Sequence, residues 1–82
     1  MNPITITKRF VLQAILAAGT GMSEPLLEDA CRAVQPALLL SDFRQALREL
    51  QSGGLIVGDR NELSEITTWG LTAEGRLRAK QL

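Results

Sequence analysis

The segment from residue 41 to residue 57 constrains the fold of this chain more than any other part of the sequence. Its apolar side chains recur at the i, i+3, i+4, i+7 spacing of one helical face, as Phe43, Ala46, Leu47 and Leu50. Two glycines follow, and the apolar run at residues 55–57 predicts a buried strand that begins at once. We therefore expect a short amphipathic helix at about residues 42–52, with its inner face fixed by the core. Its outer face is then open to a partner, which favours a binding module over an enzyme.

Both ends of this helix carry recognisable signals. Ser41 can accept a hydrogen bond from the first unpaired backbone amides, so we predict it as the N-cap. Gly53 is predicted to end the helix, because glycine adopts the left-handed conformation without steric cost. Between these two ends, the outer face carries the side chains of Arg44, Gln45 and Arg48.

The first half of the chain predicts two further helices. Residues 4–6 alternate and are predicted to be extended, with Thr7 as the cap of a helix at residues 8–18. That helix is apolar over most of its circumference, so we expect it to lie across a core or in a subunit contact. A second helix begins after Ser23, a favourable cap, and stops before Pro36. The apolar stripe predicted to be buried on it consists of Leu26, Leu27, Ala30, Cys31 and Val34.

The second half predicts a hairpin and a final helix. Residues 55–57 and 66–71 are predicted strands, joined by a polar, turn-rich loop at residues 58–65. Thr72 is predicted to cap a helix from residue 73 to about residue 81, with Leu77 as its main anchor. The expected order is helix, helix, helix, strand, loop, strand, helix.

Length and composition limit the possible classes of protein. With 82 residues, 45% of them hydrophobic, the chain supports a single domain over residues 1–82 with one small core. No apolar run, that of residues 36–40 included, approaches the roughly 18 residues that span a bilayer, and the start does not resemble a signal peptide. A lone cysteine, Cys31, excludes an internal disulfide and favours a cytoplasmic protein.

Two local patterns resemble the winged helix-turn-helix family of DNA-binding domains. Residues 46–56 (Ala-Leu-Arg-Glu-Leu-Gln-Ser-Gly-Gly-Leu-Ile) are similar to the end of a recognition helix that runs into the first wing strand. Residues 69–76 (Trp-Gly-Leu-Thr-Ala-Glu-Gly-Arg) are similar to the second wing strand and the turn into the last helix in PadR-, MarR- and ArsR-type repressors. A vaguer likeness to small winged-helix proteins of Mu-like phages also exists. The resemblance implies a mostly α fold with a small β-hairpin (α+β), in which a three-helix core is followed by a two-stranded wing and a C-terminal helix.

The same resemblance implies a function. The third helix would enter the major groove of duplex DNA, and the protein would act as a transcriptional regulator or accessory factor. Its groove-facing residues would then be Ser41, Arg44, Gln45 and Arg48, with arginine suited to guanine, glutamine to adenine and the serine hydroxyl to phosphate. We expect a homodimer through the first and last helices, because one copy offers few cationic contacts and the first helix is apolar almost all round.

Charge argues in part against this function. Nine basic and nine acidic residues give a formal charge of zero, whereas many DNA-binding domains are clearly basic. The predicted wing loop holds three acidic residues against Arg60 alone, a local balance of −2, and Asp42 stands at the start of the third helix. The alternative is therefore a winged-helix module that binds a protein partner and not DNA.

Further residues have a functional and a structural interpretation. Lys8 and Arg9 lie at a helix start, where positive charge is unfavourable, and are candidate phosphate contacts. Arg76, Arg78 and Lys80 are also candidate phosphate contacts, although positive charge suits the end of a helix in any case. At least two of the three leucines at 38–40 are expected to be buried, with an exposed patch for a partner as the alternative. Cys31 is predicted to be a core residue, and so is Trp69, with an interface anchor as the alternative for Trp69.

The sequence gives little support for an enzyme or a metal-binding protein. The chain has no histidine and no tyrosine, no glycine-rich phosphate loop and no cysteine pair that could bind zinc. Glu28 and Asp29 are adjacent, so on a helix their side chains diverge and do not converge on one site. We therefore expect no enzymatic activity, no cofactor and no metal.

Overall fold

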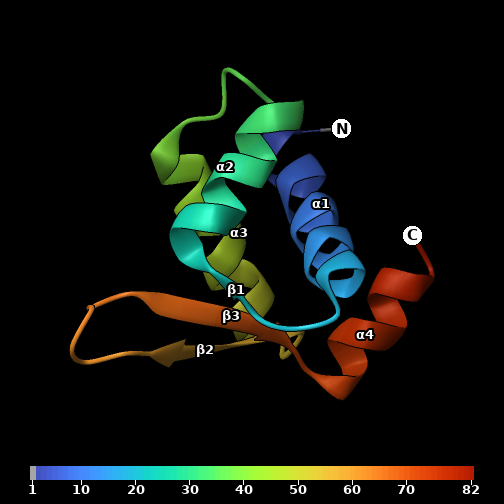
Figure 1. Ribbon diagram of the computed structural model, residues 1–82. Coiled ribbons are helices and arrows are strands. Elements are labelled where there is room, and N and C mark those ends of the chain that lie inside the picture. Colours follow the sequence, from blue (N-terminus) through green and yellow to red (C-terminus); the bar gives the residue numbers. More distant parts are fainter. Residues whose placement is uncertain (1) are drawn as a thin grey trace.

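The computed structural model describes residues 2–82, which form four helices and a three-stranded sheet (Figure 1). The elements are α1 (Pro3–Ala18), β1 (Met22–Ser23), α2 (Glu24–Val34), α3 (Leu40–Ser52), β2 (Ile56–Arg60), β3 (Thr67–Leu71) and α4 (Ala73–Lys80). The first three helices pack together, and the β2–β3 hairpin extends away from them as a wing (Figure 1). None of the helices in residues 2–82 is long and apolar enough to cross a membrane.

Helix α1 begins at Pro3, well before the expected start at residue 8. The Asn2 side chain accepts a hydrogen bond from the amide of Thr5 at 2.8 Å, and Pro3 occupies the first turn, where its missing amide costs nothing. These two signals override the alternation at residues 4–6, so the prediction of an extended segment was wrong. Thr7 is not a cap but is fully buried, and its hydroxyl lies 2.9 Å from the side-chain oxygen of Gln35.

The ends of α3 also differ from prediction. The helix begins at Leu40 with Leu39 at the N-cap position and no side-chain cap, so Ser41 lies inside the helix and does not cap it. Asp42 in the first turn complements the positive end of the helix dipole instead. At the other end, Gly53 keeps a right-handed conformation with φ −79°, and Gly54 adopts the left-handed one with φ +75°. Ser23 does cap α2, as predicted.

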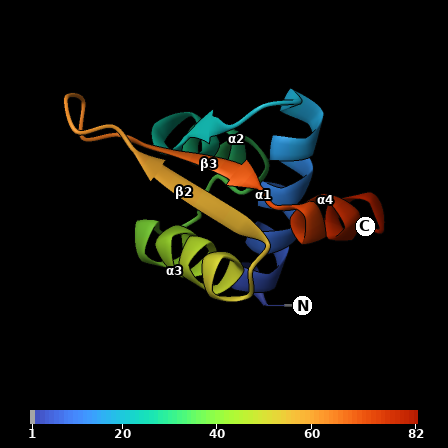
Figure 2. The ribbon, with the colours of Figure 1, turned by 90° about the horizontal axis from the view of Figure 1, so that it is seen from below.

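The sheet has the order β1-β3-β2 and is antiparallel throughout. The predicted hairpin is confirmed, with Ile56 opposite Leu71 and Gly58 opposite Trp69. A third strand, β1, pairs Met22 with Trp69 on the other side of β3. Two residues are too few to produce a periodic pattern, so the sequence prediction of a two-stranded wing missed β1. Figure 2 shows the sheet crossing one end of the helical layer.

Helix α4 is attached to the turn between α3 and β2. Thr72 caps α4, as predicted, and its hydroxyl also donates a 2.6 Å hydrogen bond to the carbonyl oxygen of Gly54. Gly75 lies so close to Leu55 that an added Cβ would sit 1.8 Å from the Leu55 carbonyl oxygen. This approach turns Gly75 and Ala79 inward, and Leu77, the predicted anchor, points outward with 63% of its surface exposed.

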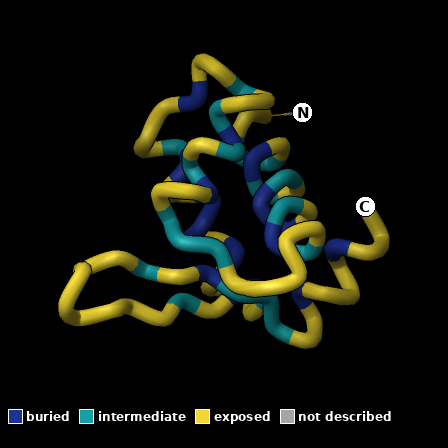
Figure 3. The backbone as a smooth tube through the Cα atoms, viewed as in Figure 1, coloured by how far each residue is buried: buried dark blue, intermediate teal, exposed yellow. Residues whose placement is uncertain are grey.

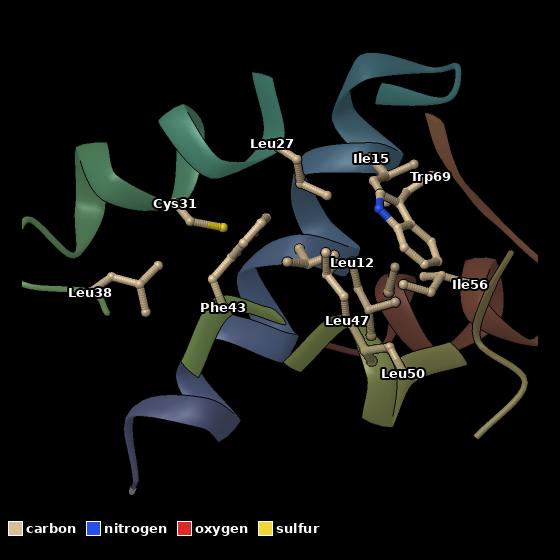
Figure 4. Close-up of a cluster of buried hydrophobic side chains, with 12 residues drawn as sticks. Leu12, Ile15, Leu27, Cys31, Leu38, Phe43, Leu47, Leu50, Ile56 and Trp69 are labelled. Carbon is tan, nitrogen blue, oxygen red and sulfur yellow. The ribbon is translucent and has the colours of Figure 1, made fainter. Parts of the chain in front are cut away.

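The core lies between the three first helices and the sheet (Figures 3 and 4). The predicted inner face of α3 is confirmed, and Cys31 and Trp69 are buried as expected. Of the three leucines at 38–40, only Leu38 is buried, so the expectation of at least two was wrong. Leu26 and Val34, predicted for the buried stripe of α2, are also more than half exposed.

Candidate nucleic-acid interface

The outer face of α3 is solvent-exposed along its length. Because the inner face is held in the core, the side chains of Ser41, Arg44, Gln45 and Arg48 all project outward, as the sequence predicted. Their binding role is a prediction that the geometry permits and does not by itself test.

A groove of about 430 Å³ separates α3 from the wing and brings three arginines together. Arg44 and Arg48 line it from α3, and Arg60 lines it from the end of β2. Within residues 2–82, none of these three guanidinium groups forms a hydrogen bond or an ion pair with another side chain. The groove therefore offers three guanidinium groups without a hydrogen bond or ion pair in the described chain, and the charge of Arg48 also acts on the neighbouring Glu49.

Arg60 was visible in the sequence only as one charge of the wing loop, and its position in this groove was missed. Its place follows from the strand period: Ile56 is buried, so Gly58 and Arg60 lie on the same side of β2 as Ile56. Gly58 is opposite Trp69, whose ring fills the space that a side chain at 58 would need. The alternation that begins at Ile56 was the signal that could have identified Arg60.

Two acidic side chains reduce the positive charge of the groove. Glu24 accepts a 3.0 Å hydrogen bond from Nε1 of Trp69, which anchors it at the start of α2. Glu65 lines the groove from the wing. Three positive charges against two negative charges leave the groove positive, less strongly than the α3 face alone would indicate.

Glu49 occupies the outer edge of α3 and holds two of the predicted contact residues. Lys8 of α1 forms a 3.0 Å ion pair with one of its oxygens, and the Gln45 amide donates a 2.9 Å hydrogen bond to the other. The hydrogen bonds from Lys8 and Gln45 lower the pKa of the Glu49 carboxyl below its usual value. Lys8 is thus brought beside the α3 face, and a negative charge interrupts the positive surface at that point.

The other basic residues lie away from the groove. Arg9 lines a pocket between α1 and α2 and a second one near α4. The α4 residues Arg76 and Arg78 are exposed but do not line the groove. The structure therefore brings Lys8 near α3 and leaves Arg9 outside the arginine groove.

No metal centre emerges from the described residues. Within residues 2–82, no group of three or more histidine, cysteine, aspartate or glutamate side chains is arranged to hold an ion. Burial raises the pKa of the Cys31 thiol to about 11, with a smaller contribution from Glu28. A thiol in that environment is a packed core group and not a nucleophile or ligand at neutral pH.

Three helices, a hairpin wing and a short strand that pairs with it define a winged-helix domain. The fold is similar to two solved structures of ZitR from Lactococcus lactis, one of a singly substituted mutant (TM-score 0.68, 22% identity) and one of a doubly substituted mutant in apo form (TM-score 0.70, 23% identity). The alignments cover 92% and 95% of this chain but 47% and 55% of those chains, so it spans about half their length. No protein-family model matches the sequence, and no curated protein matches it.

Proposed function

We propose that this protein binds duplex DNA with α3 in the major groove and acts as a transcriptional regulator or accessory factor in the cytoplasm. The observation that carries the proposal is the groove that Arg44, Arg48 and Arg60 line, none of them with a hydrogen-bond or ion-pair partner in the described chain. Guanidinium groups that the fold does not pair suit phosphate oxygens and the paired acceptors of guanine.

Each exposed residue of α3 has a chemically distinct task in this proposal. Arg44 and Arg48 read base edges or bind phosphate, and Ser41 at the start of the helix donates to a phosphate oxygen. Gln45 reads adenine: one amide hydrogen is held by Glu49, and the other hydrogen and the carbonyl oxygen remain available. Arg60 adds a positive contact from the wing, although the wing loop as a whole, with Arg60 included, keeps its local balance of −2.

Fluorescence anisotropy with random-sequence duplex DNA at low salt tests this proposal. We expect binding whose affinity falls as salt rises, because phosphate contacts release counterions. The double variant Arg44→Ala/Arg48→Ala should weaken binding by about 100-fold and lower the salt slope by roughly 2. Undetectable binding of the unaltered protein, or binding insensitive to salt, would contradict the proposal.

The matched control removes the same charge elsewhere. Arg76→Ala/Arg78→Ala takes two exposed arginines from α4, outside the groove. Because α4 belongs to the proposed dimer contact, sedimentation must first show that this variant keeps the oligomeric state of the unaltered protein. The variant should change affinity only slightly if contact with α3 is what matters. Equal loss in the two double variants would show that only net charge is being measured.

A homodimer through α1 and α4 is part of the proposal. Leu77 on α4 is 63% exposed and Ile6 on α1 is 40% exposed, so both helices of this contact present apolar surface. Sedimentation of the protein with and without Leu77→Ser tests the contact; dissociation into monomers is expected for the variant.

The second candidate is a protein-interaction module that does not bind DNA. The exposed leucines Leu39 and Leu63 and the acidic wing loop favour it. The buried Trp69 argues against one form of it, because this residue cannot act as an interface anchor.

A further inference from the structure

The outer edge of α3 carries a hydrogen-bonded chain of three polar side chains that links it to α1. Nζ of Lys8 lies 3.0 Å from one oxygen of the Glu49 carboxylate, and Nε2 of Gln45 lies 2.9 Å from the other. Gln45 and Glu49 are about one helical turn apart, so their side chains lie on the same stripe of α3. Each oxygen of Glu49 therefore has a donor, one from α1 and one from α3.

The backbone beneath this chain is fixed by the core. Each of the three residues has a buried neighbour in sequence, and these neighbours are Thr7, Ala46 and Leu50. They hold α1 and α3 against the core, so the three polar side chains start from fixed positions. The Gln45 side chain is exposed, and it is therefore open to contact from outside the protein.

The carboxylate of Glu49 decides how the Gln45 amide is turned. An ionised carboxylate only accepts hydrogen bonds, whereas a glutamine amide carries two donor hydrogens and one acceptor oxygen. The hydrogen bonds from Lys8 and Gln45 lower the pKa of Glu49, so this carboxyl is ionised at neutral pH. Gln45 must therefore turn its NH₂ group toward Glu49 and its carbonyl oxygen away from it. The second amide hydrogen and the oxygen form no hydrogen bond within residues 2–82.

A fixed amide can distinguish the two orientations of an adenine–thymine base pair. In the major groove adenine presents an acceptor, N7, beside a donor, the N6 amino group, and one glutamine amide pairs with both. The order of this acceptor and donor across the groove reverses when A·T becomes T·A. An amide held in one orientation matches one order only. An amide that is free to turn over matches either, because the last side-chain torsion of glutamine is roughly two-fold.

We propose that Glu49 is a positioning residue for sequence recognition: by holding one hydrogen of the Gln45 amide, it makes Gln45 read adenine on one strand of the duplex only. Lys8 holds the carboxylate in place from α1. The inference rests on the proposed function, and it adds a source of base-pair discrimination in a residue that itself touches no base. A negative charge beside the DNA lowers affinity, and selectivity is what it provides in return.

Selection from a pool of duplexes with a randomised core, followed by sequencing of the bound fraction, tests this role. Gln45→Ala identifies the base pair that Gln45 reads, because adenine preference is lost there. At that base pair we expect the unaltered protein to favour A·T over T·A about tenfold. Glu49→Gln should reduce this ratio to about twofold or less, because a glutamine at 49 both donates and accepts and so permits either orientation of Gln45. The overall affinity of Glu49→Gln for the pool should not fall.

Asp29→Asn is the matched control, because it removes one negative charge at an exposed position of α2 that lines none of the surfaces around α3. It should leave the A·T to T·A ratio unchanged. The proposal is overturned if Glu49→Gln keeps the ratio of the unaltered protein, or if Asp29→Asn lowers the ratio equally.

The same experiment separates this inference from the proposed function. If the pool binds with the expected salt dependence but Gln45→Ala changes no base preference, the role of Glu49 is wrong and DNA binding stands. If the unaltered protein does not bind the pool at all, both fall together.

Discussion

One buried thiol makes the stability of the fold sensitive to alkaline pH. Cys31 is fully buried beside Phe43 and Leu27 in the core, and burial raises its pKa from 9.0 to about 11. A raised pKa means that the folded state favours the neutral thiol more strongly than the unfolded chain does. Stability from this group is complete below pH 9 and is lost as pH rises toward 11.

We expect the free energy of unfolding to fall by about 2 kcal/mol between about pH 8 and pH 11 because of Cys31. Urea unfolding of the protein and of Cys31→Ala at several pH values measures it. The variant loses some packing at every pH but lacks this additional decline. Parallel pH profiles for the two proteins would show that another group causes the loss.

At the scale of elements, one close approach fixes the last helix. Gly75→Ala would place a methyl group 1.8 Å from the Leu55 carbonyl oxygen, which is backbone and cannot turn aside. Helix α4 must then move away from the start of β2 and lose the Thr72–Gly54 hydrogen bond. We expect the free energy of unfolding, measured by thermal denaturation, to fall by at least about 3 kcal/mol. Ala73→Gly, which alters an exposed residue of the same helix, should cost about 1 kcal/mol or less.

Substitutions of the two glycines after α3 distinguish the cost of a left-handed backbone from the cost of a close contact. Gly54 has φ +75° and open space where a Cβ would lie, so Gly54→Ala pays only for the left-handed backbone, about 1 kcal/mol. Gly53 is right-handed, and Gly53→Ala should be close to neutral, with a tight 3.3 Å contact to the Glu49 carbonyl oxygen. Chemical denaturation compares the two variants. A larger loss at Gly53 would contradict this assignment of the left-handed residue.

Elements with a repeating pattern could be predicted from the sequence, and elements set by single contacts could not. The buried face of α3 and the hairpin follow from apolar spacing, and Ser23 and Thr72 cap helices as their chemistry predicts. β1 was missed because two residues carry no period, and Leu77 was misplaced because Gly75 decides which side of α4 faces inward.

The candidate site was predictable only in part for a similar reason. The outward residues of α3 follow from helical spacing, so Arg44 and Arg48 were identified. Arg60 reaches the same groove only through the packing of β2 against α3, and Glu49 meets Lys8 across 41 positions of sequence. The alternation from Ile56 gives the side of β2 on which Arg60 lies, but no local pattern shows that this side borders α3 or that Glu49 meets Lys8.

For the whole molecule, the arrangement of charge matters more than its sum. A net charge of zero gives no overall attraction to DNA, so binding depends on which side chains border the α3 face. Glu49 is a negative group at that border, and it also holds Lys8. We therefore expect Glu49→Gln to raise affinity for random duplex DNA by about threefold to tenfold, because it removes a repulsive charge and releases Lys8.

Asp29→Asn is the control that separates the local effect from the overall charge. Asp29 is exposed on α2, lines none of the surfaces around α3, and its loss raises the net charge by the same unit. Anisotropy titrations at matched ionic strength should show little change for this variant and a clear gain for Glu49→Gln. An equal gain in both variants would mean that affinity depends on net charge alone. It would contradict the assignment of α3 to the DNA interface. A gain in Glu49→Gln alone, removed again by Lys8→Ala, would assign the effect to the released ammonium group.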